Sequence, residues 1–323
     1  MNAVTKSTDM IAAALMITFL LVTMSPTQAR VAIVATIAQI GEPLSVITEG
    51  RAHVETLMGE GVDPHLYRLT RSDVIRLNRA DMIVFNGLHL EAQMADMLRR
   101  FSRRKPVIGV ANTLKDQAVL LWDGKAHDPH VWMDPSLWIT ALSVAIEALA
   151  KIDPPNGQFY RANANAYFKR LHDLHIRAKK AMASIPPASR VLITAHDAFG
   201  YFGRAFAIDV MAVQGVSTES EAGIRRIEFL VDALVQRRIG AVFVETTVSD
   251  RNIRALIEGA NTRNHRVRVA GPLYSDAMGR KGTYVGEYLG MLDHNVTTIV
   301  RALGGIAPKH GFGGQLATTG TAR

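Results

Sequence analysis

The sequence predicts an α/β protein of two lobes with mainly parallel sheets, joined by one long connecting α-helix. Short β-rich runs alternate with helical patterns from residue 31 to residue 110, and a second alternating set begins at residue 190. Between the two sets, residues 158–184 carry an uninterrupted helical pattern. Alternating strands and helices are typical of a parallel sheet covered by helices on both faces. A chain of 323 residues is long enough for two such lobes.

The composition is that of an ordinary globular protein. Hydrophobic residues make up 48% and charged residues 20%, a balance that argues against disorder over most of the length. The chain has no cysteine, which excludes disulfide frameworks, cysteine-ligated zinc modules, iron–sulfur clusters and thiol catalysis. Any metal ion must therefore be held by His, Asp or Glu. The net charge of +8 predicts a mildly basic surface, and we assign the basic run at 99–105 to a solvated helix end rather than to nucleic-acid binding.

The first 29 residues have the features of a secretory signal peptide. An apolar run from Met10 to Met24 follows Lys6, and Thr27 and Ala29 are small residues suited to cleavage after Ala29. The run is shorter than the roughly 20 residues that span a bilayer, although an uncleaved membrane anchor is the alternative. Because there is no cysteine at the cleavage point to carry a lipid, we expect an exported protein that is free in a Gram-negative periplasm and is not a lipoprotein.

Residues 30–155 form the predicted N-terminal lobe. Its β-rich runs are bounded by Gly, Pro or Asn, as strands usually are, and cover Val31–Ile37, His53–Met58, Asp81–Asn86 and Pro106–Val110. The segment Thr70-Arg71-Ser72-Asp73 has a capping-box pattern that opens a helix through Ala80. A further helix is predicted over Leu88–Arg104 from apolar residues at helical spacing.

A connecting helix is predicted over 156–185 and a C-terminal lobe over 186–303. Asp153-Pro154-Pro155-Asn156-Gly157 ends one helix and starts the next, which Pro186-Pro187 terminates. At 1.5 Å per residue this helix is on the order of 40 Å long, which favours a stiff connector over a flexible hinge. Residues 304–323 are rich in Gly and Thr and predict a disordered tail. The strands predicted in the second lobe are Arg190–His196, Asp209–Gly215, Ala241–Thr246 and Val267–Tyr274, and the helices are Glu221–Arg238 and Asp250–Arg263.

The tripeptide Asp-Pro-His occurs twice, at 63–65 and 128–130, which is far more than composition predicts by chance. Proline fixes φ and restricts the residue before it, so His65 and His130 are each presented from a rigid turn. The neighbouring carboxylate is placed to accept the second ring N–H and to fix the tautomer. Both turns follow strand or loop segments of the first lobe, and open α/β sheets bind ligands at the carboxyl ends of their strands.

The second lobe offers His196 and Asp276 in equivalent positions. His196 follows the apolar strand Val191-Leu192-Ile193-Thr194, and Asp276 lies just beyond the strand that ends at Tyr274. Two ligands from each lobe would form a metal site with three His and one Asp in the cleft between the lobes. A single histidine is more often structural than a ligand, but four such residues at strand ends favour a metal site.

At these residues the chain resembles the metal-binding solute-binding proteins of zinc and manganese ABC importers, the TroA-like receptors (cluster A-I). The resemblance covers residues 31–303 and implies two α/β lobes joined by a long helix, with the metal bound between them. By the motif match, His65 and His130 are ligands from the first lobe, and His196 and Asp276 from the second. The segments that carry it are 61–67 (GVDPHLY), 85–91 (FNGLHLE), 128–135 (DPHVWMDP), 194–202 (TAHDAFGYF) and 273–278 (LYSDAM).

The resemblance also implies a function. Receptors of this kind perform no chemistry: they capture Zn²⁺ or Mn²⁺ as the transported ligand and hand it to a membrane permease driven by a cytoplasmic ATPase. We therefore expect a monomeric binding protein that is not an enzyme, has no nucleic-acid partner and has an ABC transporter permease as its protein partner.

Two departures from the family pattern leave the metal open between zinc and manganese. Zinc-specialised members carry a long His- and acid-rich loop before the second ligand, whereas residues 112–128 hold only His127. Manganese-specialised members often have Glu at the third ligand position, where this chain has His196. Nitrogen-rich sites bind Zn²⁺ more tightly than Mn²⁺, so the metal bound most tightly in vitro and the metal supplied by the cell can differ.

Four of the remaining histidines are weighed as ligands and are left out of the predicted site. We assign His127 to a solvated loop, with an accessory ligand as the alternative, and His89 to capping or packing at a helix start. His172 and His175 have helical spacing and belong more simply to a solvated helix face than to a metal-binding pair.

Glu245 ends an apolar strand near the predicted site and is a candidate for a group behind the ligands or for a substitute ligand. Trp132 and Trp138 are assigned to packing.

The alternative function is a secreted zinc-dependent hydrolase, because three His ligands with a water molecule form a catalytic pattern. The predicted ligands fill the coordination sphere, however, and no carboxylate is clearly placed as a general base. A scaffold or adhesion protein with a structural metal is a third possibility.

Overall fold

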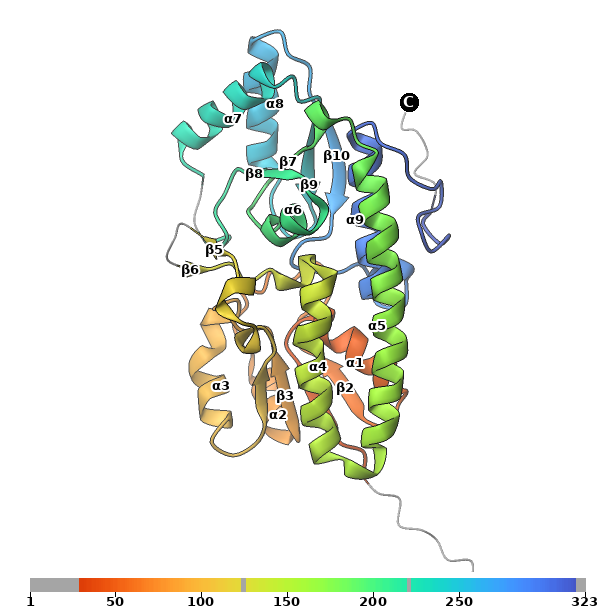
Figure 1. Cartoon of the computed structure of the whole chain (residues 1–323). Helices are drawn as coiled ribbons and strands as arrows, with labels where there is room; N and C mark the ends of the chain where they lie inside the picture. Colours follow the sequence, from red (N-terminus) through yellow and green to blue (C-terminus); the bar gives the residue numbers. More distant parts are fainter. Residues whose placement is uncertain (1–28, 123–125, 220–221, 318–323) are drawn as a thin grey trace, which may run out of the picture.

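A computed structural model describes residues 29–122, 126–219 and 222–317. The first lobe is built on a four-stranded sheet of order β2-β1-β3-β4 (Figure 1), in which every neighbouring pair is parallel. Ile33 is paired with Val54 on one side and with Met82 on the other. Because the strands run in one direction, their carboxyl ends share one edge of the sheet. The strands are β1 (Ala32–Ala35), β2 (His53–Thr56), β3 (Met82–Phe85) and β4 (Val107–Gly109).

Helices cover this sheet and begin where the sequence provides caps. At the start of α2, the Thr70 hydroxyl accepts the backbone N–H of Asp73, and the Asp73 carboxylate accepts the N–H of Thr70 at 2.7 Å. The predicted capping box is therefore confirmed. The central strands lie in the core, with Ile33 and Ile83 fully buried. The helices of the first lobe that precede the long helices are α1 (Ala38–Thr48), α2 (Arg71–Arg79) and α3 (Ala95–Phe101).

The helix predicted over 88–104 is shorter in the structure. Gly87, Leu88 and His89 all have positive φ, at 93°, 51° and 66°, and a 3-10 turn, η1 (Ala92–Met94), precedes α3. The buried carboxylate of Glu91 accepts the backbone N–H groups of Asn86 and Gly87 at 2.7 and 3.0 Å. These bonds stabilise a left-handed turn at the place where apolar spacing alone predicted a helix.

Short elements lead from the first sheet to the long helices. A two-stranded antiparallel hairpin, β5–β6, lies among 3-10 turns, and the last of these turns directly follows the second Asp-Pro-His motif. In chain order the elements are η2 (Ala111–Thr113), η3 (Asp116–Ala118), β5 (Leu121–Trp122), β6 (Ala126–His127) and η4 (Val131–Met133).

Two helices that lie side by side, α4 (Pro135–Ile152) and α5 (Pro154–Ala183), carry the chain into the second lobe (Figure 1). The 30-residue α5 begins two residues before the connecting helix predicted over 156–185, because proline is tolerated in the first turn of a helix. It packs against α1 in the first lobe and against α6 and α9 in the second. By length and composition α4 is apolar enough to cross a membrane, but its Trp138 and Leu142 are fully buried in the core.

The second lobe contains two parallel strand pairs, β7 with β8 and β9 with β10, and β7 lies next to β9. Its core includes Val191, Ile193 and Val242, all fully buried. The predicted α/β layering of this lobe is therefore found. The elements are β7 (Val191–Thr194), α6 (Gly200–Phe206), β8 (Asp209–Ala212), α7 (Ile224–Gln236), β9 (Ala241–Glu245), α8 (Arg251–Thr262), β10 (Arg268–Leu273), η6 (Tyr284–Gly286) and α9 (Tyr288–Ala302), with η5 (Pro187–Ser189) before them.

Residues 304–317 pack against α9 instead of forming the disordered tail predicted for 304–323. The backbone N–H groups of Phe312 and Gly313 each donate to the buried Asp293 carboxylate at 2.8 Å, and Leu316 is only 9% exposed. The glycines serve a compact turn, since Gly311 has a φ of 72° that other residues avoid. The signal peptide predicted for 1–29, except for its last residue, and the chain end at 318–323 lie outside the described residues.

Candidate metal centre

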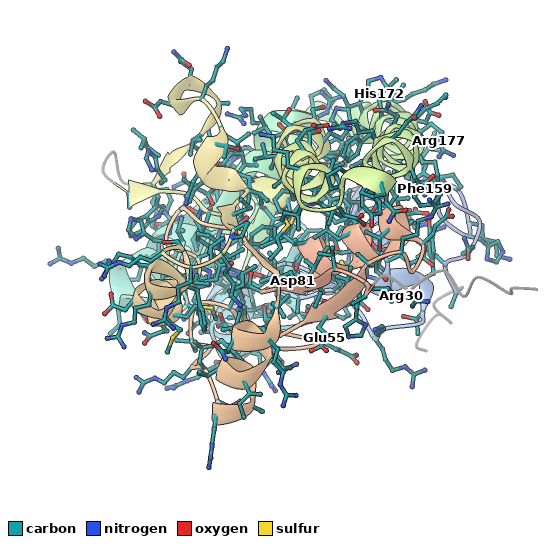
Figure 2. All side chains as sticks on the ribbon, turned by 90° about the horizontal axis from the view of Figure 1, so that it is seen from below. Arg30, Glu55, Asp81, Phe159, His172 and Arg177 are labelled. Carbon is teal, nitrogen blue, oxygen red and sulfur yellow. The ribbon has the colours of Figure 1, made fainter. Side chains whose placement is uncertain are left out.

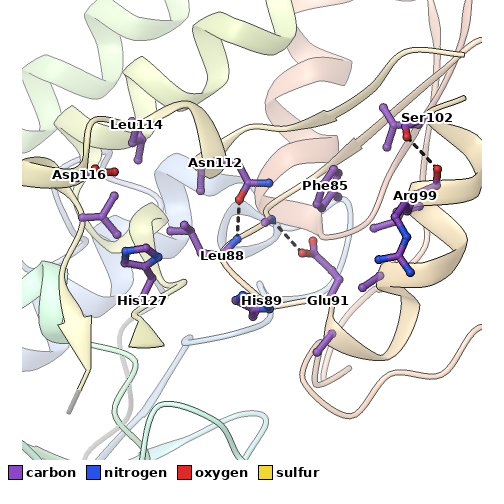
Figure 3. Close-up of a pocket in the computed structure, with 17 residues that line it drawn as sticks. Phe85, Leu88, His89, Glu91, Arg99, Ser102, Asn112, Leu114, Asp116 and His127 are labelled. Atoms are coloured by element: carbon purple, nitrogen blue, oxygen red, sulfur yellow. Dashed lines mark hydrogen bonds between the residues drawn. The ribbon is translucent and has the colours of Figure 1, made fainter. Parts of the chain in front are cut away.

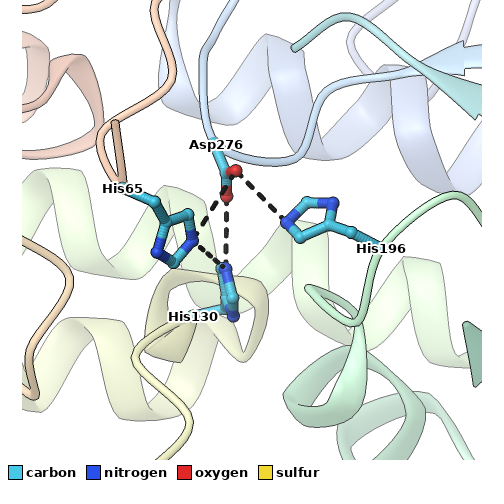
Figure 4. A group of neighbouring side chains, drawn as sticks. All are labelled: His65, His130, His196 and Asp276. Atoms are coloured by element: carbon cyan, nitrogen blue, oxygen red, sulfur yellow. Dashed lines mark hydrogen bonds and ion pairs between the residues drawn. The ribbon is translucent and has the colours of Figure 1, made fainter. Parts of the chain in front are cut away.

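Four side chains from four separate loops meet between the lobes (Figure 4). His65 lies in the loop after β2, His130 directly precedes η4, His196 follows β7 and Asp276 follows β10. One candidate ligand atom from each side chain lies within 4.8 Å of the others. The four residues, hereafter the ligand cluster, are all buried, with exposed fractions of 5%, 0%, 0% and 2% in chain order. The structure therefore brings together the four residues proposed from the sequence.

The spacing of the ligand atoms fits a small cation. Nε2 of His130 and Nε2 of His196 each lie 3.2 Å from an oxygen of Asp276. Nε2 of His65 lies 3.3 Å from Nε2 of His130 and 3.9 Å from Asp276 Oδ2. A tetrahedral ion with bonds of about 2.1 Å holds its ligand atoms about 3.4 Å apart. The separations seen here are close to that value.

The cluster also leaves polar atoms without hydrogen bonds. Within the described ranges, Nε2 of His196 and both carboxylate oxygens of Asp276 are buried and make no hydrogen bond of good geometry, although they lie within ion-pair distance of the neighbouring ligands. Buried polar atoms are nearly always paired, so each exception needs an explanation. Nitrogen and oxygen lone pairs that converge on one point are explained by a divalent transition-metal ion.

Carboxylates behind two of the imidazoles fix their orientation. Asp128 Oδ1 lies 2.7 Å from Nδ1 of His130, and Glu245 Oε2 lies 2.6 Å from Nδ1 of His196. Each carboxylate also accepts the backbone N–H of its histidine at 2.9 Å. With Nδ1 donating to a carboxylate, Nε2 of a neutral imidazole is left for the metal. The predicted role of the Asp-Pro-His carboxylate is confirmed for His130.

The first Asp-Pro-His copy is built differently. Asp63 accepts the backbone N–H of His65 at 2.8 Å, and its other oxygen accepts the hydroxyl of Thr218 at 2.6 Å. The expectation that Asp63 would hold the imidazole of His65 is therefore wrong. The turn directs this carboxylate toward the second lobe instead.

Burial and charge act in opposite directions on the ligand cluster. Burial lowers the pKa of His65 to about 4. Burial alone would also lower the pKa of His130, but the charge of the neighbouring Asp128 raises it to about 9. The pKa of His196 lies well above its usual value because the surrounding acidic charges outweigh burial. For Asp276, burial raises the pKa, but the charges of His196 and His130 lower it by more, so the carboxylate is ionised.

Hydrogen bonds from the core hold the second-lobe ligand loop, and the sequence reasoning missed them. Nε1 of Trp132 donates to the carbonyl oxygen of Ser275 at 2.9 Å, and Nε2 of Gln39 donates to the carbonyl oxygen of Asp276 at 3.0 Å. Trp132 also packs against the ring of His130, with the ring centroids 5.2 Å apart. Assigning Trp132 to packing alone was therefore incomplete. In the sequence, the one feature that could have suggested this role for Trp132 is its position two residues after His130.

The four histidines that were weighed and set aside all lie outside the ligand cluster. His89 and His127 line a cavity of about 590 Å³ in the first lobe (Figure 3). His172 projects from the exposed side of α5 (Figure 2). His175 is buried and packs its ring 5.2 Å from an aromatic ring of α6. His172 and His175 therefore do not form one site, although their spacing on α5 is helical.

Known proteins similar to this chain bind metal ions. The family model described as zinc-uptake complex component A, periplasmic, matches residues 33–302. The chain is 43% identical over 272 residues to the manganese-binding lipoprotein MntA of Bacillus subtilis, a match that covers 84% of this chain and 89% of the relative. It is 40% identical over 271 residues to the zinc-binding protein TroA of Treponema pallidum, a match that covers 84% of this chain and 88% of that relative. The solved structure of that periplasmic zinc-binding protein matches with a TM-score of 0.83 at 39% identity, over 85% of this chain and 99% of the other.

These relatives correct the expected localisation. MntA of Bacillus subtilis, MntA of Halalkalibacterium halodurans and SloC of Streptococcus mutans are all named lipoproteins. These printed names contradict the expectation of a free protein that is not a lipoprotein. That expectation rested on the cysteine count of the chain, which does not by itself decide where the protein is held.

The similarity extends over both lobes. The family match runs from β1 into α9 and includes all four positions of the ligand cluster. Relatives in the comparison are named for manganese, for zinc, or as substrate-binding components of metal ABC transporters. The chain therefore belongs to the family described as zinc-uptake complex component A, periplasmic.

Proposed function

We propose that this chain is an extracytoplasmic receptor that binds one Zn²⁺ or Mn²⁺ ion between its lobes and delivers it to the membrane permease of an ABC importer. The observation that carries the proposal is the ligand cluster, in which residues of both lobes meet in one buried site. A site shared by two lobes opens when the lobes or their loops move, and a transport receptor needs such a release step. The printed name of PsaA from Streptococcus anginosus, a manganese ABC transporter substrate-binding lipoprotein, supports this role.

The donor set suits both metals but not equally. Three imidazole nitrogens and one carboxylate form a nitrogen-rich site, and the affinity of such sites rises from Mn²⁺ toward Zn²⁺. We expect zinc to bind more tightly in vitro, whichever ion the cell supplies. The relatives are divided in the same way, since MntA of Bacillus subtilis is named for manganese and TroA of Treponema pallidum for zinc.

The geometry does not favour the zinc hydrolase that the sequence left open. A catalytic zinc keeps one position for water beside three protein ligands, whereas here four buried side chains surround the site. The carboxylates behind the cluster, Asp128 and Glu245, are already engaged by the Nδ1 atoms of two ligands. Relatives are named as metal-binding proteins and transporter components. On these grounds we propose a binding protein and not an enzyme.

The proposed organisation follows from the sequence. A signal peptide over 1–29 precedes an N-terminal lobe at 30–155, a connecting helix at 156–185 and a C-terminal lobe at 186–303. We propose that the chain works as a monomer and that a cytoplasmic ATPase drives its permease. The continuous α5, which packs against both lobes, supports a single rigid body for docking on such a permease.

Metal titration tests the binding half of the proposal. The chain from residue 30 is stripped of metal and titrated by calorimetry with Zn²⁺ and Mn²⁺, separately and in competition. We expect one equivalent of ion, lost in Asp276→Ala and kept in Glu258→Ala, which alters an exposed carboxylate on α8. Absence of stoichiometric binding would overturn the proposal, as would ester or peptide hydrolysis that His65→Ala abolishes.

Uptake by cells tests delivery. In a strain that lacks the gene, accumulation of the radioactive ion at low external concentration should fall. The wild-type gene should restore it, and the Asp276→Ala gene should not, although its product is exported to the same level. Restoration by the Asp276→Ala gene would contradict delivery through this site.

A further inference from the structure

The three imidazole ligands are not held equally. The Nδ1 atoms of His130 and His196 bind carboxylates at 2.7 and 2.6 Å. Nothing in the described ranges hydrogen-bonds Nδ1 of His65, whose bonds run through its backbone N–H and Nε2. A carboxylate behind a ligating imidazole fixes the ring and raises its basicity. The orientation of His65 therefore depends on the turn that carries it.

His65 is also the ligand that borders open space. A cavity of about 320 Å³ is lined by His65 and Trp122 from the first lobe and by residues between 216 and 219 from the second. The side chains of His130 and His196 have no exposed surface, whereas 5% of His65 is exposed. A path from solvent to the ligand cluster through this cavity therefore passes His65.

One carboxylate ties the turn of His65 to the second lobe. Asp63 Oδ1 accepts the backbone N–H of His65 at 2.8 Å, and Asp63 Oδ2 accepts the hydroxyl of Thr218 at 2.6 Å. Thr218 is not itself a lining residue, but it lies between Ser217 and Glu219, which both line the cavity. The bond joins residues 155 positions apart, next to the one ligand that faces the cavity.

We propose that Thr218 is a positioning residue for metal binding: its hydrogen bond to Asp63 is a latch that holds His65 on the ion, and the ion enters and leaves past His65 through the cavity. While the latch is made, the turn of His65 and the segment 216–219 stay together and the path is closed. When it breaks, the turn of His65 separates from the second lobe. His130 and His196 remain fixed by their carboxylates, so the ion loses His65 first.

The latch acts on the rate of metal release more than on the fold. The Asp63–Thr218 bond is partly buried and joins two loops, so the packed cores of both lobes do not depend on it. Loss of an outer partner of a metal ligand typically costs 10–100-fold in affinity. Because the latch closes the way out, most of this loss falls on the dissociation rate. The inference rests on the proposed function, since it takes the ligand cluster as the ion's site.

Dissociation of Zn²⁺ into an excess of chelator, followed by stopped-flow absorbance, measures the latch directly. Thr218→Val keeps the shape of the side chain and removes the hydroxyl, and we expect it to speed dissociation about 10-fold. Thr218→Ser restores a hydroxyl and should return the rate close to that of the wild type. The melting temperatures of the metal-free proteins should be the same for all three.

A neighbouring contact between the lobes provides a matched control. Gln93 donates to Glu219 at 2.8 Å on the exposed surface, so Gln93→Ala removes a bond to the same segment without touching the turn of His65. We expect its dissociation rate to equal that of the wild type. An unchanged rate in Thr218→Val, or equal acceleration in Gln93→Ala, would overturn the latch while leaving the proposed function intact. A wild-type chain that binds no stoichiometric zinc would overturn both.

Discussion

Nδ1 of His196 lies 2.6 Å from Oε2 of Glu245, and neither side chain is exposed. The second oxygen of Glu245 accepts the backbone N–H of His196 at 2.9 Å. Glu245 ends β9 and His196 follows β7, the strand that lies beside it. The packing of two strands, rather than a local turn, therefore orients this ligand.

Replacing Glu245 by glutamine should weaken zinc binding about 10–100-fold. The amide keeps the size of the side chain but carries no charge, so it supports the basicity of His196 less well. Chelator competition measures the dissociation constant, and Glu258→Gln, on the exposed side of α8, is the control. An unchanged constant in Glu245→Gln would show that the backbone alone orients the imidazole.

Trp132→Phe should lower both stability and metal affinity. It removes the donor to the carbonyl oxygen of Ser275, a residue with no exposed surface. A buried acceptor left without a partner costs about 1–3 kcal/mol, and Ser275 directly precedes the ligand Asp276. Thermal unfolding of the metal-free protein measures the first effect and calorimetric titration the second. Trp122 is 38% exposed, so the control variant Trp122→Phe should have the melting temperature of the wild type. A melting temperature of Trp132→Phe equal to that of the wild type would refute the prediction.

The metal-free chain should be folded and should gain stability when the ion binds. The apolar cores of the two lobes are made without the ligand cluster. At a free zinc concentration 100 times the dissociation constant, the gain is about 2.7 kcal/mol. Differential scanning calorimetry with and without zinc measures it, and Asp276→Ala should keep the fold and lose the gain. A metal-free chain without a cooperative transition would indicate a structural metal instead.

Glu42, which lies outside the ligand cluster, makes the stability of the fold depend on pH. Burial raises the pKa of Glu42 to about 7, even though the N–H of Tyr288 and the hydroxyl of Tyr167 donate to it at 3.1 and 3.3 Å. Glu287 raises this pKa further and Arg170 lowers it. A raised pKa in the folded state means that the native protein holds the proton more strongly than the unfolded chain. This contribution favours folding at low pH and is lost as the pH rises through about 7.

Glu42→Gln should therefore gain stability relative to the wild type as the pH rises. At about pH 8 the wild type carries a buried charge that the amide lacks, and the difference should shrink at about pH 5. The amide oxygen still accepts from both tyrosines. Melting temperatures of the metal-free proteins at the two pH values test this. A difference that is the same at both would contradict the raised pKa.

Deleting residues 304–323 should destabilise the protein. The deletion removes the N–H groups of Phe312 and Gly313 from the fully buried Asp293. Among the described residues, the hydroxyl donors of Tyr284 and Thr297 remain. Lost donors to a buried group cost about 1–3 kcal/mol. Urea unfolding measures the change, and deletion of 318–323 alone is the control. Equal stability of the two deletions would support the disordered tail that composition predicted.

Local sequence patterns were sufficient for most of the fold and for the choice of ligands. Strand-to-loop boundaries located His196 and Asp276, because parallel strands bring their carboxyl ends to one edge. The Asp-Pro-His repeat located His65 and His130, because proline makes a short turn whose geometry is set within three residues. These signals are all contained in segments shorter than ten residues.

Contacts between distant segments could not be predicted in the same way. The Trp132–Ser275 bond joins positions 143 apart, and the Asp63–Thr218 bond joins positions 155 apart. Both depend on how the lobes pack, which no local pattern encodes. The predictions for the left-handed turn before Glu91 and for the packed segment after 303 were wrong for a related reason. In each case a buried carboxylate organises the backbone by accepting its N–H groups.

The unbroken α5 has a thermodynamic consequence for ion capture. Its 30 residues extend about 45 Å and pack against both lobes. A helix of this length resists bending, so the four ligand loops stay near their bound arrangement when no ion is present. The chain then loses little conformational entropy when an ion arrives, and most of the free energy of ligation is expressed as affinity. Such preorganisation favours capture of a metal that is present at low concentration.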